Sequence, residues 1–427
     1  MGTDSARPQS TLSPNAAWET ADWIDKASRG ERKLHQVPPG MAADEAAWLR
    51  RGALERWRQV SLDHIGRHSM PLEKARCENL IGAIQVPVGV AGPLILRGQY
   101  VNDDEVFVPL ATTEGALVAS IGRGCRALNE AGGATVRVND VGITRAPLFC
   151  TSGIEESLRL IAWVSDHEDD LRMAAEQTSA RLRLVEVRPQ AVGSSVYLRF
   201  RFTTGDAMGM NLATVACERI VRDLIEPATG ARCLALSGNY CTDKKPASVN
   251  LLEGRGKRIF AEAILDPVVL AGVLKTDMQQ LCEVNYRKNL LGSAMAGTLG
   301  GFNAHYANMV AALFIATGQD VAQVAEACQG ITCVEPRNGG VYVSVFLPDV
   351  PVATVGGGTV LPTQREALGL LGIDENSSKS MGHGAMRLAE VLGGVVLAGE
   401  LSLLAALASG ELAAAHQRLG RPVTPNP

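Results

Sequence analysis

The sequence predicts an α+β fold in which a helical N-terminal region precedes a body built on β-sheet. Two segments, RLRLVEVRPQ (181–190) and SVYLRFRFTT (195–204), alternate polar and apolar residues, which is typical of half-exposed strands in an antiparallel sheet. Helical periodicity dominates DEAAWLRRGALERWRQVSLDHI (44–65). The chain has 427 residues, of which 46% are apolar, so it can bury a core divided into roughly two or three domains.

Composition disfavours several classes of protein. The formal net charge of −4 argues against a nucleic-acid partner, which requires a basic surface. The nine cysteines include no C-x-x-C pair, and the seven histidines form no H-E-x-x-H cluster. We therefore expect free thiols in a reducing cytoplasm and no metal site.

Neither end of the sequence predicts a membrane segment. Residues 1–15 are polar and Ser/Pro-rich, so we expect a disordered tail and no signal peptide. The apolar segment 391–410 is almost long enough to span a bilayer. Glu400 at its centre and four glycines favour a buried core helix of a soluble protein instead.

Residues 16–76 read as polar helices, and the apolar segment 77–96, broken by prolines and glycines, marks a domain boundary. A strand then leads through Thr112 and Thr113 into a helix, with a threonine as the expected cap and Glu114 near the helix start. Glu114 is either a carboxylate that complements the helix dipole or, desolvated by its apolar neighbours, a proton donor. Gly122–Ala127 resembles a dinucleotide fingerprint but lies inside this helix, which excludes a Rossmann site.

The most chemically informative stretch is SGNYCTDKKPASVN (237–250). It places three consecutive charges, Asp243, Lys244 and Lys245, on a loop constrained by Gly238 and a proline. Such a loop is either a solvated surface turn or an anion site. We expect Asp320 to be the partner of Lys244, because a carboxylate just beyond a helix C-terminus needs a cation.

Two glycine-containing turns could hold phosphate or a flat ring. Asp206–Asn211 opens an amphipathic helix whose free N–H groups could bind a pyrophosphate, and 354–359 contains three successive glycines. Either could equally be a plain turn. His305 and Asn308 share one helix face, and His416 lies in a C-terminal region that we expect to be mobile.

Eight motifs in order resemble the 3-hydroxy-3-methylglutaryl-CoA (HMG-CoA) reductase family: ENLIG, ATTEGALVAS, TRAP, DAMGMN, SGNYCTDKKPA, GSAMAGTLGGFNAH, FIATGQD and AGELSL. The resemblance covers residues 77–421. DAMGMN and SGNYCTDKK look like the eukaryotic-type class, without the membrane anchor of the animal enzymes.

The resemblance implies a role for each matching residue. The catalytic positions are Glu114, Lys244, Asp320 and His416. The substrate-binding positions are Ser120, Arg123, Arg145, Ser237, Asp243, Lys245, Lys275, Lys288, His305 and Asn308. The cofactor-binding positions are Ser179, Arg181, Asp206, Ala207, Met208, Gly209, Met210, Asn211, Gly356, Gly357 and Arg421.

The family's reaction is the NADPH-dependent reduction of HMG-CoA to mevalonate and CoA through thiohemiacetal and mevaldehyde intermediates, with no metal. By resemblance, Lys244 stabilises the oxyanion, Asp320 keeps Lys244 charged, Glu114 supplies a proton to the alcohol, and His416 protonates the CoA thiolate. Arginines 181, 183 and 421 favour NADPH over NADH, although Ser179-Ala180 stands where the family has Ser-Arg.

The resemblance also implies an architecture. We expect a helical N-terminal region with a dimerisation motif at 16–82, a large CoA-binding α/β domain in two segments at 83–146 and 247–427, an inserted ferredoxin-like cofactor domain at 147–236, and a catalytic connecting loop at 237–246. It further implies a dimer or tetramer with the active site between subunits, and a cis peptide at Cys241–Thr242.

Two departures concern CoA binding: Gly122 and Glu411 stand where the family has asparagine and histidine. The alternatives are a reductase of a related acyl-CoA thioester and an inactive structural homologue.

Overall fold

The computed structural model describes residues 14–66, 78–81, 83–373 and 380–410. Its N-terminal part is helical, as predicted: α1 (Pro14–Ser28) and α2 (Ala43–Arg58) form a pair around the buried side chains of Trp23 and Leu49. Helix α1 begins at Pro14, so residues 14 and 15 of the expected disordered tail are helical, and residues 1–13 lie outside the described residues. Proline is favourable in a first helical turn, where its missing N–H is not needed.

The large part of the molecule is organised on a mixed sheet in the order β2-β1-β3-β8-β11-β10-β9. The pairs β1–β3 and β9–β10 are parallel, and the other pairs are antiparallel. The strands are β1 (Val88–Arg97), β2 (Asn102–Ala111), β3 (Ala134–Arg145), β8 (Arg255–Leu265), β9 (Gly301–Phe302), β10 (Gly330–Arg337) and β11 (Gly340–Val350).

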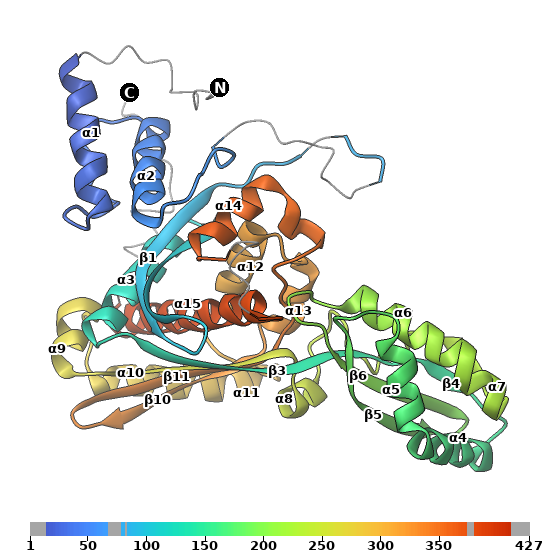
Figure 1. Ribbon diagram of the computed structural model, residues 1–427. Coiled ribbons are helices and arrows are strands. Elements are labelled where there is room, and N and C mark those ends of the chain that lie inside the picture. The colour runs from blue at the N-terminus through green and yellow to red at the C-terminus, as the bar shows by residue number, and fades with distance from the viewer. Residues whose placement is uncertain (1–13, 67–77, 82, 374–379, 411–427) are drawn as a thin grey trace.

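Helix α15 (His383–Ala408) runs along one face of this sheet and is the centre of the core (Figure 1). It packs on β3, β8 and β11 and is flanked by α3 (Leu117–Glu130) and α12 (Tyr306–Thr317). It is apolar and long enough to cross a membrane by composition, but 83% of its most apolar window is buried inside the protein. The predicted core helix is therefore confirmed.

Shorter helical elements surround this core. They are α8 (Ser248–Glu253), α9 (Pro267–Val269), η3 (Leu270–Leu274), α10 (Met278–Val284), η4 (Asn285–Gly292), α11 (Ser293–Ala296), η5 (Val321–Gln323), α13 (Val324–Ala327), η6 (Gly357–Val360) and α14 (Pro362–Leu370).

The smaller part has a β-α-β-β-α-β order and an antiparallel sheet in the strand order β7-β4-β6-β5, which is the ferredoxin-like arrangement. Its elements are β4 (Leu148–Cys150), α4 (Ile154–Asp166), α5 (Glu168–Glu176), β5 (Arg183–Val192), β6 (Ser195–Thr203), α6 (Met210–Ile220), η2 (Val221–Ile225), α7 (Glu226–Thr229) and β7 (Arg232–Ala235). Its core is separate from that around α15.

One strand joins the two parts. β3 pairs with β8 in the large sheet, and its last residues, Ile143 to Arg145, pair with β6 of the small sheet. The α+β fold class predicted from the sequence is confirmed.

The predicted half-exposure of the two strands holds for β5 but is wrong for β6. Arg199 and Arg201 of β6 have exposed fractions of only 1% and 6%. They are buried because each forms ion pairs with glutamates at the junction between the two parts.

Candidate active site

The central loop, residues 237–246, connects β7 of the small part with α8 of the large part. It lies beside the end of β3, because Gly238 N donates to Ala146 O (2.7 Å) and Thr144 Oγ1 donates to Cys241 O (2.8 Å). The chain therefore brings the TRAP and SGNYCTDKK motifs together.

The loop bends at residues other than glycine. Asn239, Thr242 and Lys244 have φ values of 64°, 61° and 59°, in the left-handed region. Gly238, which we expected to form the sharp turn, does not have a positive φ. A Cβ there would lie 2.9 Å from Cδ1 of Tyr197, so this glycine permits close packing against β6.

The expected cis peptide between Cys241 and Thr242 is not found. The cis bond that the described part of the chain contains precedes Pro93. The loop instead reverses direction through the left-handed conformation of Thr242.

Lys244 and Asp320 form the ion pair that the sequence predicted, with 2.8 Å between Nζ and Oδ2. Asp320 follows α12, which ends at Gly318 in a left-handed cap. The hydrogen bond that Lys244 donates to Asp320 is the largest cause that raises the pKa of Lys244 above its ordinary value. Lys244 is exposed as well, so a charged ammonium is presented to a ligand.

Three buried side chains that the sequence did not single out, those of Arg255, Gln323 and Glu326, hold this loop by hydrogen bonds. Arg255 Nη2 and Gln323 Nε2 both donate to Oδ1 of Asp243, at 3.1 and 2.9 Å. The carboxylate of Glu326 accepts the backbone N–H of Lys244. Asp243, predicted as a substrate ligand, thus has a carboxylate oxygen occupied by two buried side chains.

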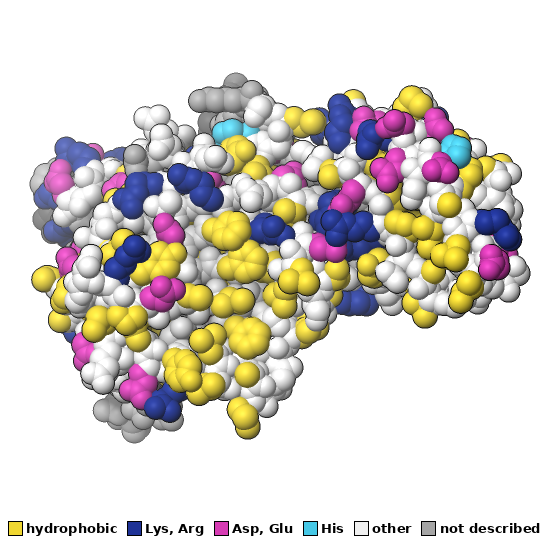
Figure 2. Space-filling view, turned by 90° about the horizontal axis from the view of Figure 1, so that it is seen from below, with side chains coloured by type: hydrophobic (Ala, Val, Ile, Leu, Met, Phe, Trp, Pro, Cys, Tyr) yellow, Lys and Arg dark blue, Asp and Glu magenta, His cyan; other side chains and the backbone are white. Residues whose placement is uncertain are grey.

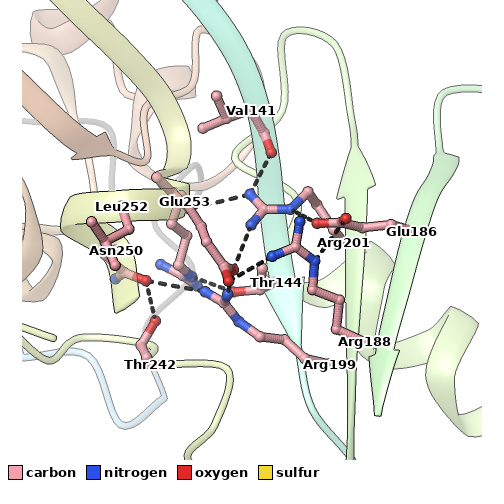
Figure 3. A network of polar contacts seen from close by, with 12 residues as sticks. Val141, Thr144, Glu186, Arg188, Arg199, Arg201, Thr242, Asn250, Leu252 and Glu253 are labelled. Atoms are coloured by element: carbon pink, nitrogen blue, oxygen red, sulfur yellow. Dashed lines mark hydrogen bonds and ion pairs between the residues drawn. The ribbon is translucent and has the colours of Figure 1, made fainter. Parts of the chain in front are cut away.

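A second network ties the loop to the small part (Figure 3). Oδ1 of Asn250 accepts hydrogen bonds from Thr242 Oγ1 (3.0 Å) and from Arg199 Nη2 (3.1 Å). Arg199 and Arg201 of β6 also pair with Glu253 of α8. The arginines are buried and Glu253 is half-buried, so these charge-assisted hydrogen bonds position the small part and the loop together.

The other predicted substrate residues of this region lie on or beside the loop. The Oγ of Ser237 is 3.3 Å from Sγ of Cys241, and Lys245 Nζ donates to the carbonyl of Asp243 at 2.9 Å. Arg145 ends β3, and its Nε is buried without a hydrogen-bond partner among the described residues. An unpaired, buried guanidinium N–H is suited to an anionic ligand.

Four predicted substrate residues are tied to the AGELSL segment of α15. Ser120 Oγ lies 2.9 Å from Oγ of Ser402, and Arg123 Nη2 donates to the carbonyl of Ser402 at 2.6 Å. The Nε2 of His305 is 3.0 Å from the carbonyl oxygen of Gly399. His305 is the residue before α12, and Asn308 Nδ2 is 3.4 Å from its Nδ1.

Glu400, which the sequence suggested only as a core residue, organises this group. Its buried carboxylate accepts the N–H groups of Ala304 (2.8 Å) and His305 (2.7 Å) and the hydroxyl of Thr332 (2.7 Å). A carboxylate at the first turn of α12 also complements the helix dipole. Burial of a charged residue in an apolar helix was the sequence signal for such a role.

The remaining two lysines stay apart from the loop. Lys275 and Lys288 are exposed, and neither forms a hydrogen bond or ion pair with residues 237–246 in the described structure. Lys275 Nζ donates to the carbonyl of Gly272 at 2.8 Å.

The two predicted cofactor turns lie side by side. Thr354 N donates to Asp206 O (2.9 Å), which joins the 354–359 segment to the turn before α6. The carboxylate of Asp206 accepts from Gly382 N (2.9 Å) and Ala385 N (3.0 Å) at the start of α15. Asp206 therefore caps a helix and locks the turn of the small part onto the large part.

This pair of turns has the form of a cradle for a cofactor. Gly356 and Gly357 have φ values of 76° and 55°, and a Cβ on either would meet no atom within 4 Å. Gly209 precedes α6 and has a φ of 99°. The backbone N–H groups of residues 210 and 211, in the first turn of α6, therefore have no partner inside the helix. Gly318 and Gly358 pack backbone to backbone, so the cradle adjoins Asp320.

Two further cofactor candidates lie on the edge of the small part. Ser179 and Arg181 occupy the turn between α5 and β5, where Ser179 Oγ accepts from Arg181 N at 3.2 Å. The side chain of Arg181 is exposed. His416 and Arg421 lie outside the described residues.

Glu114 lies outside helix α3, and the single chain leaves its predicted role as a proton donor a prediction. Helix α3 begins at Leu117 behind Ala116 (φ 72°), so Glu114 precedes the helix. Thr112 does not cap α3, because its Oγ1 accepts from Glu114 N at 3.0 Å. The glutamate is exposed, so its own apolar neighbours do not desolvate it. Its carboxylate pairs with neither Lys244 nor Asp320 among the described residues.

Comparison with known proteins is consistent with this site. The family model described as hydroxymethylglutaryl-coenzyme A reductase matches residues 46–421. The 3-hydroxy-3-methylglutaryl-coenzyme A reductase of Methanothermobacter thermautotrophicus is 50% identical over 403 residues, which are 93% of this chain and 99% of that protein. The corresponding reductase of Aeropyrum pernix is 49% identical over 94% of this chain and 96% of its own length. The 3-hydroxy-3-methylglutaryl-coenzyme A reductase 1 of Dictyostelium discoideum is 42% identical over 93% of this chain and 73% of its own length.

Solved structures show the same fold. The class II 3-hydroxy-3-methylglutaryl-CoA reductase of Streptococcus pneumoniae, bound to NADPH in open conformations, superposes with a TM-score of 0.65 over 86% of this chain and 97% of that chain. The sequence identity in that comparison is 21%.

Proposed function

Because the chain belongs to the hydroxymethylglutaryl-coenzyme A reductase family, we propose that it reduces HMG-CoA to mevalonate and free CoA with NADPH. The observation that carries the proposal is the Lys244–Asp320 ion pair, which holds an ammonium at 2.8 Å from its carboxylate on the constrained loop. A fixed cation of this kind stabilises the oxyanion that forms when a thioester carbonyl is reduced.

We assign the remaining steps to residues around this pair. Asp320 keeps Lys244 protonated, and Arg145 and Lys245 bind the carboxylate of the substrate or the thiohemiacetal oxygen. Glu114 supplies the proton to the final alcohol, and His416 protonates the departing CoA thiolate. Ser120, Arg123, His305 and Asn308 complete the substrate site along α15.

NADPH supplies the hydrides when it is bound. The glycine cradle at 356–357 and the turn at 206–211 are the residues that would hold it, because they are open and lie beside Asp320. The exposed Arg181 suits a ribose 2′-phosphate. Asp206 acts by locking these turns together.

We further place the chain in the eukaryotic-type class. It is 42% identical to the Dictyostelium reductase but only 21% identical to the class II enzyme of Streptococcus. The described cysteines are all free thiols, which supports a cytoplasmic location.

A steady-state assay with a panel of acyl-CoA thioesters tests the proposed reaction. We expect HMG-CoA to have the highest kcat/KM, two NADPH to be oxidised per thioester, and NADPH to be preferred over NADH. Greater activity with another thioester, or a preference for NADH, would overturn the assignment.

We also propose that the enzyme is a dimer or a dimer of dimers, with each site shared between subunits. Glu114 is exposed in the single chain and does not pair with Lys244. The face of the large sheet turned away from α15 carries many apolar side chains (Figure 2), and β8 exposes Phe260 and Ile264 by 43% and 53%. Apolar patches of this kind mark interaction surfaces.

Subunit complementation tests the shared site. Glu114→Gln and Lys244→Ala should each inactivate the homodimer. A heterodimer purified with one subunit of each kind should recover about half of the wild-type activity, because one of its two sites then contains both native residues. If both residues act within one chain, every site of the heterodimer lacks one of them and no activity returns.

A further inference from the structure

A buried cluster of charged side chains contacts the central loop, residues 237–246. It consists of Arg255 at the start of β8, Glu326 on α13 and Asp349 near the end of β11, all with an exposed fraction of 0%. Arg255 is the one cation among the three. Buried charges are costly unless they are paired and hydrogen-bonded, so their arrangement needs an explanation.

Each carboxylate oxygen of Glu326 accepts one hydrogen bond among the described residues and has a second lone pair left. Its Oε1 accepts the backbone N–H of Lys244, and its Oε2 accepts from Arg255 Nη1 at 2.5 Å. The same guanidinium donates through Nη2 to Asp243 at 3.1 Å. The buried Arg255–Glu326 ion pair therefore holds two neighbouring loop residues, Asp243 and Lys244. Lys244 has a φ of 59°, which a side-chain-bearing residue adopts only when its surroundings impose it.

Asp349 completes the cluster from the other side. Its Oδ2 accepts from Asn250 Nδ2, whereas its Oδ1 is buried and accepts no hydrogen bond from the described residues. Asp349 is paired with Arg255 in the register of β11 and β8, so its carboxyl lies near the guanidinium of Arg255 and the Glu326 carboxylate that this guanidinium binds. A neighbouring buried carboxylate disfavours ionisation of a second carboxyl, and a proton on Asp349 converts its unpaired oxygen into a hydrogen-bond donor. Burial and the charge of Glu326 raise the pKa of Asp349 well above its ordinary value, in the direction this requires.

We propose that Asp349 and Glu326 share one proton as a buried acid–carboxylate pair that fixes the backbone of Lys244, and so positions its ammonium for the reaction. The pair acts through Lys244 and does not touch the substrate. The inference rests on the proposed function, because positioning matters only if Lys244 stabilises the oxyanion.

The hydrogen-bond pattern predicts opposite tolerance of two amide substitutions. Glu326→Gln places an NH₂ group against the N–H of Lys244 or the guanidinium of Arg255, so donors oppose each other. Asp349→Asn instead reproduces the pattern, because its NH₂ replaces the O–H toward Glu326 and its oxygen still accepts from Asn250. Asp349→Leu removes both functions at similar volume.

The test compares kcat and KM of the purified, folded full-length variants. Glu326→Gln and Asp349→Leu should lower kcat by up to about 100-fold, the scale of a small misplacement, with a smaller change in the KM for HMG-CoA. Asp349→Asn should recover most of the loss seen in Asp349→Leu, to within about threefold of wild type. Should Asp349→Leu not fold, Glu326→Gln against Asp349→Asn decides the matter.

Glu390→Gln is the matched control. Glu390 is an equally buried carboxylate of α15 that accepts backbone N–H groups of residues 99–101, away from the loop. It should lower Tm without lowering kcat. The inference is overturned if Glu326→Gln keeps wild-type kcat, if Asp349→Asn is as damaged as Asp349→Leu, or if Glu390→Gln loses kcat equally. A fully active Lys244→Ala would overturn both this inference and the assigned role of Lys244.

Discussion

Lys244→Ala is expected to lower kcat by about 100- to 1,000-fold in both reductions, of HMG-CoA and of mevaldehyde. Each reduction passes through a negatively charged oxygen, and Lys244 is the ammonium that the structure holds next to Asp320 at 2.8 Å. Removing it deletes a charge that is already in place before the reaction begins. Separate assays with the thioester and with the free aldehyde measure the two losses.

Asp320→Asn is the matched variant, because it keeps the shape of the pair and removes only its negative charge. The hydrogen bond that Lys244 donates to the Asp320 carboxylate raises the pKa of Lys244. Activity that needs the ammonium is lost as the pH rises through that pKa, so Asp320→Asn should shift the alkaline limb of the pH–rate profile to lower pH. A Lys244→Ala variant that loses activity in only one reduction, with normal thermal unfolding, would contradict the shared oxyanion role.

The parts of the site that the sequence predicted are those with local signals. Lys244 stands out by its charged loop, and Asp320 by its place after a helix that ends in glycine, so their pairing could be inferred across 76 positions from charge alone. The paired strands followed from periodicity, and the core helix followed from a long apolar segment with Glu400 at its centre. The order of strands in the small sheet came from the family resemblance, because pattern alone does not fix register or neighbours.

Long-range burial of charge could not be read from the sequence. Arg199 and Arg201 occupy the polar positions of an alternating strand, yet they are buried because Glu253, more than fifty residues away, packs against them. Glu326 and Asp349 likewise lie in separate elements, and only their approach to Arg255 makes a cluster. The sequence also predicted that apolar neighbours would shield the carboxyl of Glu114 from solvent. In the structure Glu114 is exposed, because its neighbours in sequence do not pack around it.

His416→Gln is expected to separate the two reductions, although this residue lies outside the described structure and its role is inferred from the family motif. The first reduction ends when the thiohemiacetal expels CoA as a thiolate. The expelled thiolate is a strong nucleophile that adds back to the aldehyde unless it is protonated, and a thiol pKa near 8.5 makes the protonated form the stable one at neutral pH. Loss of one general acid should lower thioester reduction by about 100- to 10,000-fold.

Mevaldehyde reduction should fall far less in the same variant, because the aldehyde carries no thiol leaving group and its reduction needs only Lys244 and Glu114. Lys244→Ala provides the comparison, since it should disable both reactions. Both activities are measured for each variant at saturating NADPH, so that a change in cofactor affinity does not mimic a loss of chemistry. Equal losses of the two activities in His416→Gln would mean that the histidine positions the cofactor or closes the site, and its assignment as the proton donor to CoA would have to be withdrawn.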